Sequence, residues 1–367
     1  MRRLLLLLAA AALPACHHRR DDDAIGPGFA SNTVLIVTSE GTPRTLAILS
    51  VDVVSGRLGL MPGSPADVGA PVNDVETLAV DTLRRRVIVG SSLTGVIAVV
   101  SIAADGSIAP VAGSPFAAER AAPSVCFLNG DVLYVGYEGD SVISQYAVDP
   151  ATGALSTLAP TLTIAGTHVE SIARSGDFLF VGCNTTSNIV TLAIDPATGV
   201  LSTTGLAIAT NVRPDYLRVL GSRLYGSLSA DGTVDAFDIN PATGALTRLA
   251  GAPYPYPGLG IYEHIEVQPG GQFVAVGSEL PPAAALYAVN ADGSLSPSGT
   301  AQVMPGTQGG PEGMEFTPDG RFLYVANHIE SGIYVFPVGT GTLGAPRRWR
   351  LEGAQIDLAL VGMSVAP

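Results

Sequence analysis

An eight-residue phrase recurs at nearly constant intervals along this chain, and the repeat limits the possible folds more than any other feature. The phrase reads "DPATGALS" at 149–156, "DPATGVLS" at 195–202 and "NPATGALT" at 240–247. Weaker copies, aligned on their glycine, extend the series to seven positions that lie 45 to 50 residues apart: Gly56, Gly106, Gly153, Gly199, Gly244, Gly293 and Gly341. A repeat of this length is typical of a solenoid, a propeller or another repeat array.

Turn chemistry explains the phrase. Asp or Asn followed by Pro starts a turn, and Gly supplies the positive φ that closes it. Alternating apolar sequence on both sides, "SQYAVD" before and "ALSTLA" after, indicates a hairpin. Two further apolar runs precede the hairpin in nearly every unit, as "HVESIA" and "FLFVGCN" do before the loop at 195. Four strands per unit are typical of a propeller blade, so we predict an all-β, seven-bladed β-propeller with four antiparallel strands per blade.

The two ends of the repeat region are complementary. The first unit lacks its first strand, because the repeats begin at "NTVLIVTSE", and the seventh unit is followed by a surplus strand, "IDLALVGMSV", at 356–365. We predict that this last strand completes the first blade, which closes the ring and removes an open sheet edge. The propeller is then one domain over residues 30–367.

The amino terminus differs from the rest of the chain. "MRRLLLLLAAAALPAC" has a basic start and an apolar run too short for a permanent membrane helix, which predicts a signal peptide over residues 1–15 and export. Residues 13–16, Leu-Pro-Ala-Cys, resemble the lipobox of bacterial lipoproteins, which implies lipidation of Cys16 and a periplasmic or outer-membrane anchor in the cell envelope. Ordinary cleavage nearby, with Cys16 incidental, is the alternative. Residues 16–29 are predicted to be a polar tether.

Composition excludes several functions. The net charge is −13 and all 19 basic residues are arginine, so no lysine can act as a Schiff base or general base. The acidic balance argues against a nucleic-acid partner and against binding to anionic lipid, so we expect membrane contact only through the anchor. The expected partner of this monomer is a small-molecule ligand or an envelope protein. Cys126 and Cys183 lie in strand-like sequence, and whether they pair stays open.

One segment carries a family resemblance. "PEGMEFTPDGRFLYVANHIESGIYVFPV" at 311–338 resembles the lactonase-type seven-bladed propellers, which include bacterial 6-phosphogluconolactonase, the fungal carboxymuconate-lactonizing enzyme and surface proteins with Tyr-Val-Thr-Asn repeats. "GSPF" at 113–116 and the DPATG loops are also similar to this family. The resemblance covers the predicted propeller and is specific for fold, but catalytic and non-catalytic members share it.

Blade geometry predicts which side chains meet. The start of the first strand and the end of the second strand of every blade lie on one face, around the central channel. From the first strands this face receives Asp74, Glu76, His168, Glu170, Asp215, Glu263, His264, Glu312 and Asp357. From the second strands it receives Glu40, Glu138, Asn184, Glu279, Asn327 and His328.

The resemblance nominates catalytic candidates in this set. Glu279 and His264 stand where the family tends to carry the Glu of an Asn-Glu-Leu motif and the His of a Pro-Arg-His motif, and His168 matches the first His of Pro-His-x-His. Glu263 replaces the arginine and Glu170 the second histidine of these motifs. Members of the family carry a basic residue after the second strand of the last blade, whereas this chain has "NHIES" there.

These departures bear on the ligand. Arg213 is the only arginine expected near this face, and Glu263 stands where the family carries another. A phosphorylated or carboxylated lactone would therefore lack its usual cationic clamp. We predict that Glu170, Arg213, Glu263, Glu312 and His328 contact the ligand. His168 and His264 could instead hydrogen-bond the backbone of a neighbouring blade, and Glu279 could be a solvated rim residue.

Three functions remain open. One is a propeller that binds a small ligand or a protein partner at its channel face. The second is a lactone hydrolase in which a Glu/His pair activates water. The third adds Ca²⁺, held by the carboxylates, to polarise the ester carbonyl. Our main expectation is that the protein uses no cofactor.

Overall fold

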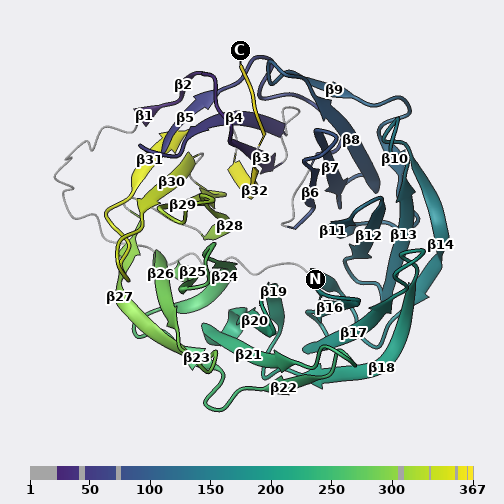
Figure 1. The fold of residues 1–367 in the computed structure, drawn as a ribbon, viewed down its shortest axis with the longest axis vertical. Helices are drawn as coiled ribbons and strands as arrows, with labels where there is room; N and C mark the ends of the chain where they lie inside the picture. Colours follow the sequence, from purple (N-terminus) through teal and green to yellow (C-terminus); the bar gives the residue numbers. More distant parts are fainter. Residues whose placement is uncertain are drawn as a thin grey trace, which may run out of the picture.

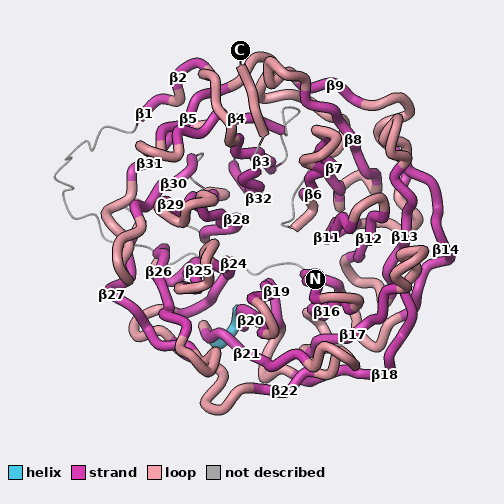
Figure 2. The backbone as a smooth tube through the Cα atoms, in the orientation of Figure 1, coloured by secondary structure: helices cyan, strands magenta, loops and turns pink. Residues whose placement is uncertain are grey.

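Seven antiparallel sheets surround a central channel, as in the predicted seven-bladed propeller (Figure 1). This computed structural model describes residues 23–40, 46–71, 76–304, 310–329, 332–351, 354–361 and 363–366. Strands and their connecting loops make up almost all of this backbone (Figure 2), and its helical content is one 3₁₀ turn, η1 (Ser229–Asp231). Within these ranges, no helix has the length and apolar character needed to cross a membrane.

Each blade contributes four main strands, numbered here outward from the channel. The innermost strands of blades 1 to 7 are β32 (Ala354–Val361), β6 (Leu78–Asp81), β11 (Pro123–Asn129), β15 (Val169–Ser175), β19 (Pro214–Leu220), β24 (Gly260–Val267) and β28 (Pro311–Phe316). The second strands are β3 (Val34–Glu40), β7 (Arg86–Ser91), β12 (Val132–Tyr137), β16 (Phe178–Cys183), β20 (Arg223–Leu228), β25 (Phe273–Leu280) and β29 (Phe322–Asn327). The third strands are β4 (Leu46–Asp52), β8 (Val96–Ile102), β13 (Val142–Val148), β17 (Asn188–Ile194), β21 (Thr233–Ile239), β26 (Pro282–Val289) and β30 (Gly332–Pro337). The outer strands are β5 (Arg57–Leu60), β9 (Ile108–Pro110) with β10 (Phe116–Ala117), β14 (Leu155–Thr163), β18 (Leu201–Ala209), β22 (Leu246–Arg248) with β23 (Tyr254–Pro255), β27 (Leu295–Val303) and β31 (Arg347–Arg350).

The last strand of the chain closes the ring, as the sequence predicts. β32 pairs antiparallel with β3, with Val34 opposite Val361, so the innermost strand of blade 1 comes from the carboxyl end of the chain. Two short strands from the predicted tether also join the ring. β1 (Asp23–Ala24) pairs with β31 of blade 7, and β2 (Gly26–Pro27) pairs with β5 of blade 1, both in parallel. The paired backbone therefore begins before residue 30.

The hydrophobic core lies between blades. The second strands are buried along almost their whole length, because each blade is packed between two neighbouring blades. One core cluster joins Ala173, Phe180 and Ile189 of blade 4 to Leu217, Leu224, Phe237 and Ile239 of blade 5. Burial of such side chains contributes about 1.5 to 3 kcal/mol each, and every blade depends on its neighbours for it.

The repeated hairpin has a second role, which is to dock on the preceding blade. Gly244 has a φ of +71°, and a Cβ at this position would lie 2.6 Å from Cδ1 of Phe178 on the preceding blade. In other blades the hairpin is also held by the preceding blade through a hydrogen bond to its glycine carbonyl. Tyr134 donates to Gly199, and Tyr225 donates to Gly293. Glycine is therefore required both by the turn and by the neighbouring blade.

The two cysteines of the propeller do not pair. Cys126 and Cys183 are both buried, neither forms a disulfide, and they belong to different core clusters. Burial raises the pKa of the Cys183 thiol to about 12, so this residue behaves as a small apolar side chain.

Gly244→Ala should destabilise the propeller more than the same change at Gly205, which has a similar φ of +75° but no atom within 4 Å of an added Cβ. Backbone strain alone costs about 1 to 2 kcal/mol, and the clash with Phe178 adds about 1 to 3 kcal/mol. Urea denaturation of both variants measures the difference. Equal losses would show that hairpin docking does not contribute to stability.

Candidate functional site

Four carboxylates occupy equivalent positions at one end of the channel. Each follows the start of the innermost strand in one of four consecutive blades, at a point where the pairing register with the second strand shifts. A bulge of this kind turns a side chain away from its regular position and is common beside functional sites. We call this set the mouth carboxylates: Glu170, Asp215, Glu263 and Glu312. The sequence predicted all four at this face.

Glu279, at the end of β25, adds a fifth carboxylate, and its side chain meets that of Glu263. Gly310 lies between them, since an added Cβ there would come within 3.0 Å of Cγ of Glu263 and 3.6 Å of Cγ of Glu279. Burial raises the pKa of Glu263 to about 8, and the charges of Glu312, Glu279 and Asp215 add to the increase. A hydrogen bond between Glu263 and Glu279 contributes in the same direction. The pair therefore holds a shared proton near neutral pH.

His168 forms an ion pair with the first mouth carboxylate. Its Nε2 lies 2.8 Å from Oε2 of Glu170, and its backbone has a φ of +64°. The hydrogen bond to Glu170 raises the pKa of His168, against the opposing effect of burial. His168 is therefore more readily protonated than an ordinary histidine. It does not serve only as a backbone anchor, although its carbonyl does accept a bond from the Asn184 N–H.

Asp215 is the most buried of the mouth carboxylates. Burial raises its pKa to about 7, and the Glu170 charge raises it further, while Arg213 opposes the increase. The Asn184 side chain donates to Asp215 Oδ1 at 3.0 Å, and Arg213 Nε lies 3.7 Å from the same oxygen. Arg213 also donates to Ser229. The arginine that was predicted to contact a ligand is thus already engaged by the protein.

Glu312 is paired with His328, whose Nδ1 lies 2.8 Å from Glu312 Oε1. Both were predicted at this face, and both are partly exposed. Within the described ranges, the ion pairs of the mouth involve His168, Arg213 and His328, and none of them is made with Glu263 or Glu279. The Glu263–Glu279 pair is therefore the part of the mouth without a cation of its own.

His264 lies beneath the mouth surface, with only 1% of its area exposed. Its ring packs on Tyr216 with centroids 4.3 Å apart, and its Nε2 lies 3.2 Å from Nη2 of Arg218. Burial and the Arg218 charge hold the pKa of His264 well below its usual range, so the imidazole is neutral. Because Arg218 donates to Nε2, the ring proton resides on Nδ1.

Arg218 is a central residue that the sequence reasoning missed. Its Nη1 lies 2.6 Å from Glu76 Oε1 and its Nε lies 2.6 Å from Glu266 Oε2. Glu76 belongs to blade 2 and Arg218 to blade 5, three blades apart and so on opposite sides of the ring, and Ser171 of blade 4 donates to Glu76. We call these residues the Arg218 network: Glu76, Ser171, Arg218, His264 and Glu266. It crosses the channel and forms the floor of the mouth.

The signal for Arg218 was present but indirect. Three residues after Asp215, Glu263 and Glu312, the innermost strands carry Arg218, Glu266 and Glu315. An alignment of the seven inner strands would have shown a second charged level below the mouth. The single-strand pattern "PDYLRVL" did not, since an arginine between apolar residues also fits an exposed strand.

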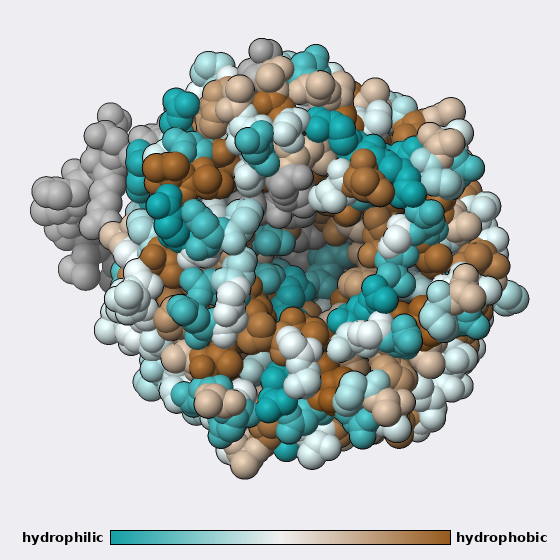
Figure 3. Space-filling model, in the orientation of Figure 1, coloured by the Kyte–Doolittle hydropathy of each residue, from teal (hydrophilic) through white to brown (hydrophobic). Residues whose placement is uncertain are grey.

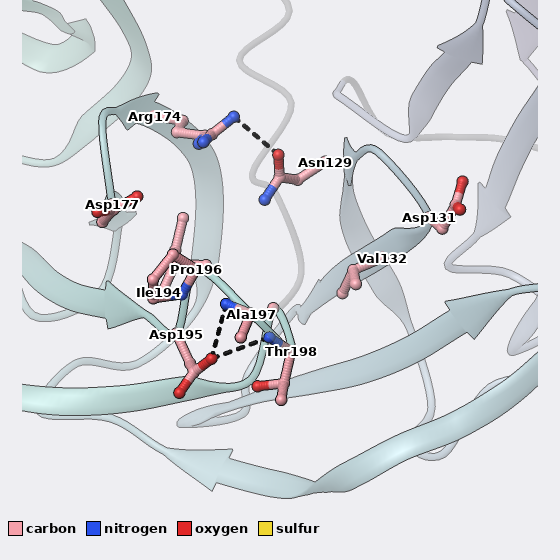
Figure 4. Close-up of a pocket in the computed structure, with 11 residues that line it drawn as sticks. Asn129, Asp131, Val132, Arg174, Asp177, Ile194, Asp195, Pro196, Ala197 and Thr198 are labelled. Carbon is pink, nitrogen blue, oxygen red and sulfur yellow. Dashed lines mark hydrogen bonds between the residues drawn. The ribbon is translucent and has the colours of Figure 1, made fainter.

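Two cavities accompany the channel. One, of about 400 Å³, is bounded by the Arg218 network and by residues from all seven innermost strands. Figure 3 shows one face of the ring, hollowed at its centre, where hydrophilic side chains lie deep in the hollow. The other cavity, of about 360 Å³, lies between the turns of blades 3 and 4 (Figure 4), and two of the carboxylates that line it are engaged. Asp195 accepts bonds from its own loop, and Asp131 pairs with Arg84.

Some predicted residues lie outside the described part of the chain. Cys16 and Asp74 are among them, as are the side chains of Glu40 and Asp357. Glu138 is exposed on the mouth rim, and Asn327 is buried. In the ranges that are described, no group of three or more His, Cys, Asp or Glu side chains is arranged to hold a metal ion.

The fold and the acidic mouth define a seven-bladed propeller whose site opens at one end of its channel. A family model described as "Lactonase, 7-bladed beta-propeller" matches residues 113–213 and 263–355, which together make up more than half of the chain. The protein therefore belongs to the lactonase family of seven-bladed β-propellers.

Solved structures share this fold at low sequence identity. A Bacteroides uniformis protein assigned as a 6-phosphogluconolactonase is 16% identical, with a TM-score of 0.77 over 90% of this chain and 99% of that one. A Bacteroides fragilis protein with the same assignment is 17% identical, with a TM-score of 0.75 over 90% and 98%. The periplasmic gluconolactonase PpgL of Pseudomonas aeruginosa is 19% identical, with a TM-score of 0.74 over 91% and 99%. No curated protein sequence matches this chain closely enough to indicate an activity.

The raised pKa of Glu263 predicts a pH-dependent stability. The folded state keeps this proton up to about pH 8, whereas the unfolded state loses it near pH 4.5, so the free energy of unfolding falls as pH rises between these values. Glu263→Gln removes that loss. The variant should match the parent near pH 4.5 and gain on the order of 2 to 4 kcal/mol over it above pH 8.

Urea denaturation across this pH range tests the difference. Asp177→Asn, at an exposed turn on the opposite face, controls for the loss of one negative charge. Parallel stability curves for the parent and Glu263→Gln would contradict the raised pKa.

Proposed function

We propose that the channel mouth binds a lactone and hydrolyses its ring ester. The observation that carries this proposal is the Glu263–Glu279 pair, which shares one proton in a partly enclosed site and has no cation partner among the described residues. A carboxylate in such a site can accept a proton from water as a general base. Family membership supports the same reaction class, although fold alone does not determine activity.

The mouth supplies a base and an acid for this reaction. Glu279 takes a proton from water as the water oxygen bonds to the carbonyl carbon. The ring C–O bond then breaks, and the leaving oxygen receives a proton from His168, whose pKa is raised by its hydrogen bond to Glu170. Solvent returns the proton from Glu279 to His168, and the product is the hydroxy acid.

The other predicted residues assist these two. His264 is too deeply buried to act as the base, and its neutral ring supports Tyr216 and the floor of the mouth. Glu170, Glu263, Glu312 and His328 would contact the bound ligand, as the sequence suggested. Arg213 acts through Asp215, because its guanidinium is already engaged there.

A second function is binding without catalysis, and one observation favours it. The mouth lacks a free arginine in the described residues, so it cannot clamp the phosphate or carboxylate of an anionic lactone as a cationic site would. The mouth would then bind a small ligand or an envelope protein without turnover. A Ca²⁺-assisted hydrolase remains the third candidate and is tested by the same assay.

Export and anchoring complete the proposal. The basic start, the short apolar run and Cys16 support an exported lipoprotein of the cell envelope, held by its lipid with the propeller in the periplasm or at the outer membrane. We propose that it acts as a monomer.

Glu279→Gln should abolish most hydrolysis while keeping the fold. The purified propeller is assayed against five- and six-membered lactones, with spontaneous hydrolysis subtracted and with either Ca²⁺ or a chelator present. Loss of the base should lower kcat on the order of a hundredfold, and Asp177→Asn should retain the parent rate. A Glu279→Gln variant as fast as the parent would remove Glu279 from the mechanism. A parent that hydrolyses no lactone would favour the binding function.

Cys16→Ser should release the protein from the membrane, because the acyl acceptor is lost. Fractionation of cells that produce the parent and the variant, with mass spectrometry of the amino terminus, measures anchor and processing. A parent without an acyl chain, or a variant that stays with the membrane, would disprove the lipoprotein assignment.

A further inference from the structure

The mouth carries far more negative than positive charge. Among the described residues, four mouth carboxylates and Glu279 face two histidines and one arginine, and each of these three already pairs with a carboxylate. Mutual repulsion is large enough to contribute to the raised pKa values of Glu263 and Asp215. A bound phosphate or carboxylate would add to this repulsion, and a bound cation would relieve it.

A second observation, independent of the carboxylates, points to a missing ligand. The Tyr216 hydroxyl is buried, with 2% of the residue exposed, and it has no hydrogen-bond partner. It interacts electrostatically with Glu312, Glu170 and Glu263, which are three of the mouth carboxylates, and with Glu76 of the Arg218 network. The His264 ring packs against the Tyr216 ring, and its buried side chain interacts with the Glu312 backbone. A buried hydroxyl without a partner is unfavourable, and a ligand that hydrogen-bonds to Tyr216 would remove that cost.

The available groups match a particular ligand chemistry. A protonated amine offers three donors, which suit carboxylates and the Tyr216 oxygen, and it also favours the face of an aromatic ring. A bare divalent ion fits less well, because the described side chains do not form a group that could hold a metal.

We infer that the mouth recognises a protonated amino group, and that its substrate is an amino lactone rather than a phosphorylated or carboxylated one. The substrate assignment rests on the proposed hydrolysis, whereas the preference for an amine rests on the mouth alone. The amine lies among Glu263, Glu279 and Glu312, and its charge takes the place of the shared proton.

Matched ligands test the charge preference without hydrolysis. The probe is 3-aminopyrrolidin-2-one, a lactam with the ring and amine of an amino lactone but no ester, and its N-acetyl derivative has the same ring without the charge. Calorimetry at pH 7 should detect binding of the amine to the protein. The acetylated ring should bind at least on the order of tenfold more weakly. Binding should release protons, measured as a dependence of the heat on the buffer, since the amine displaces the proton held by Glu263.

Variants separate the mouth from general charge effects. Glu312→Gln should weaken amine binding on the order of tenfold, and Glu263→Gln should remove the proton release. Asp177→Asn, with the same loss of charge on the opposite face, should bind as the parent does. Equal affinity for the amine and its acetyl derivative, or equal weakening by Asp177→Asn, would overturn the inference. Displacement of the probe by CaCl₂, but not by NaCl of equal ionic strength, would also overturn it in favour of a divalent cation.

Hydrolysis is then measured with homoserine lactone and N-acetylhomoserine lactone. Faster turnover of homoserine lactone than of its N-acetyl derivative would support both the hydrolase function and the charge preference. Selective binding of the amino lactam with no lactone turnover would refute the hydrolase and leave the charge preference standing. Equal turnover of the two lactones, unchanged by Glu312→Gln, would refute the charge preference and leave the hydrolase standing.

Discussion

The docking of each hairpin on the preceding blade is the contact on which the ring depends. Gly244 packs on Phe178, and the carbonyls of Gly199 and Gly293 accept bonds from tyrosines one blade earlier. A single blade has two apolar faces and cannot bury either alone. The same glycine must therefore turn the chain and fit the neighbour, which is why the phrase around it recurs with so little change. Closure by β32 extends this mutual burial around the whole ring.

The rigid ring makes a crowded acidic mouth possible. Carboxylates that repel one another at a channel opening destabilise the fold, and only a scaffold held from all sides keeps them close. The bulges in the innermost strands bring Glu170, Asp215, Glu263 and Glu312 to one level in four successive blades. Protonation of the most buried of them relieves part of the repulsion. The strain is thus concentrated where a ligand would bind.

The Arg218 network separates this mouth from the rest of the channel. A buried guanidinium between two carboxylates is costly to desolvate, and it persists because Glu76 and Glu266 satisfy it from different blades. It also keeps His264 neutral and fixes its tautomer. The mouth therefore has a charged floor, formed by side chains that meet across the channel.

The sequence by itself determined the number of blades, the hairpin in each, the closing strand and the face on which Glu170, Glu263, Glu279 and Glu312 gather. These follow from local periodicity, because a repeat fixes which end of every strand meets the channel. Tertiary structure alone decided the depth and the pairing of the side chains. It buried His264, engaged Arg213 with Asp215, joined Arg218 to Glu76 across the ring and added β1 and β2 to the outer edges. Such contacts join residues far apart in the chain, and their partners depend on how the closed ring packs, which no local pattern records.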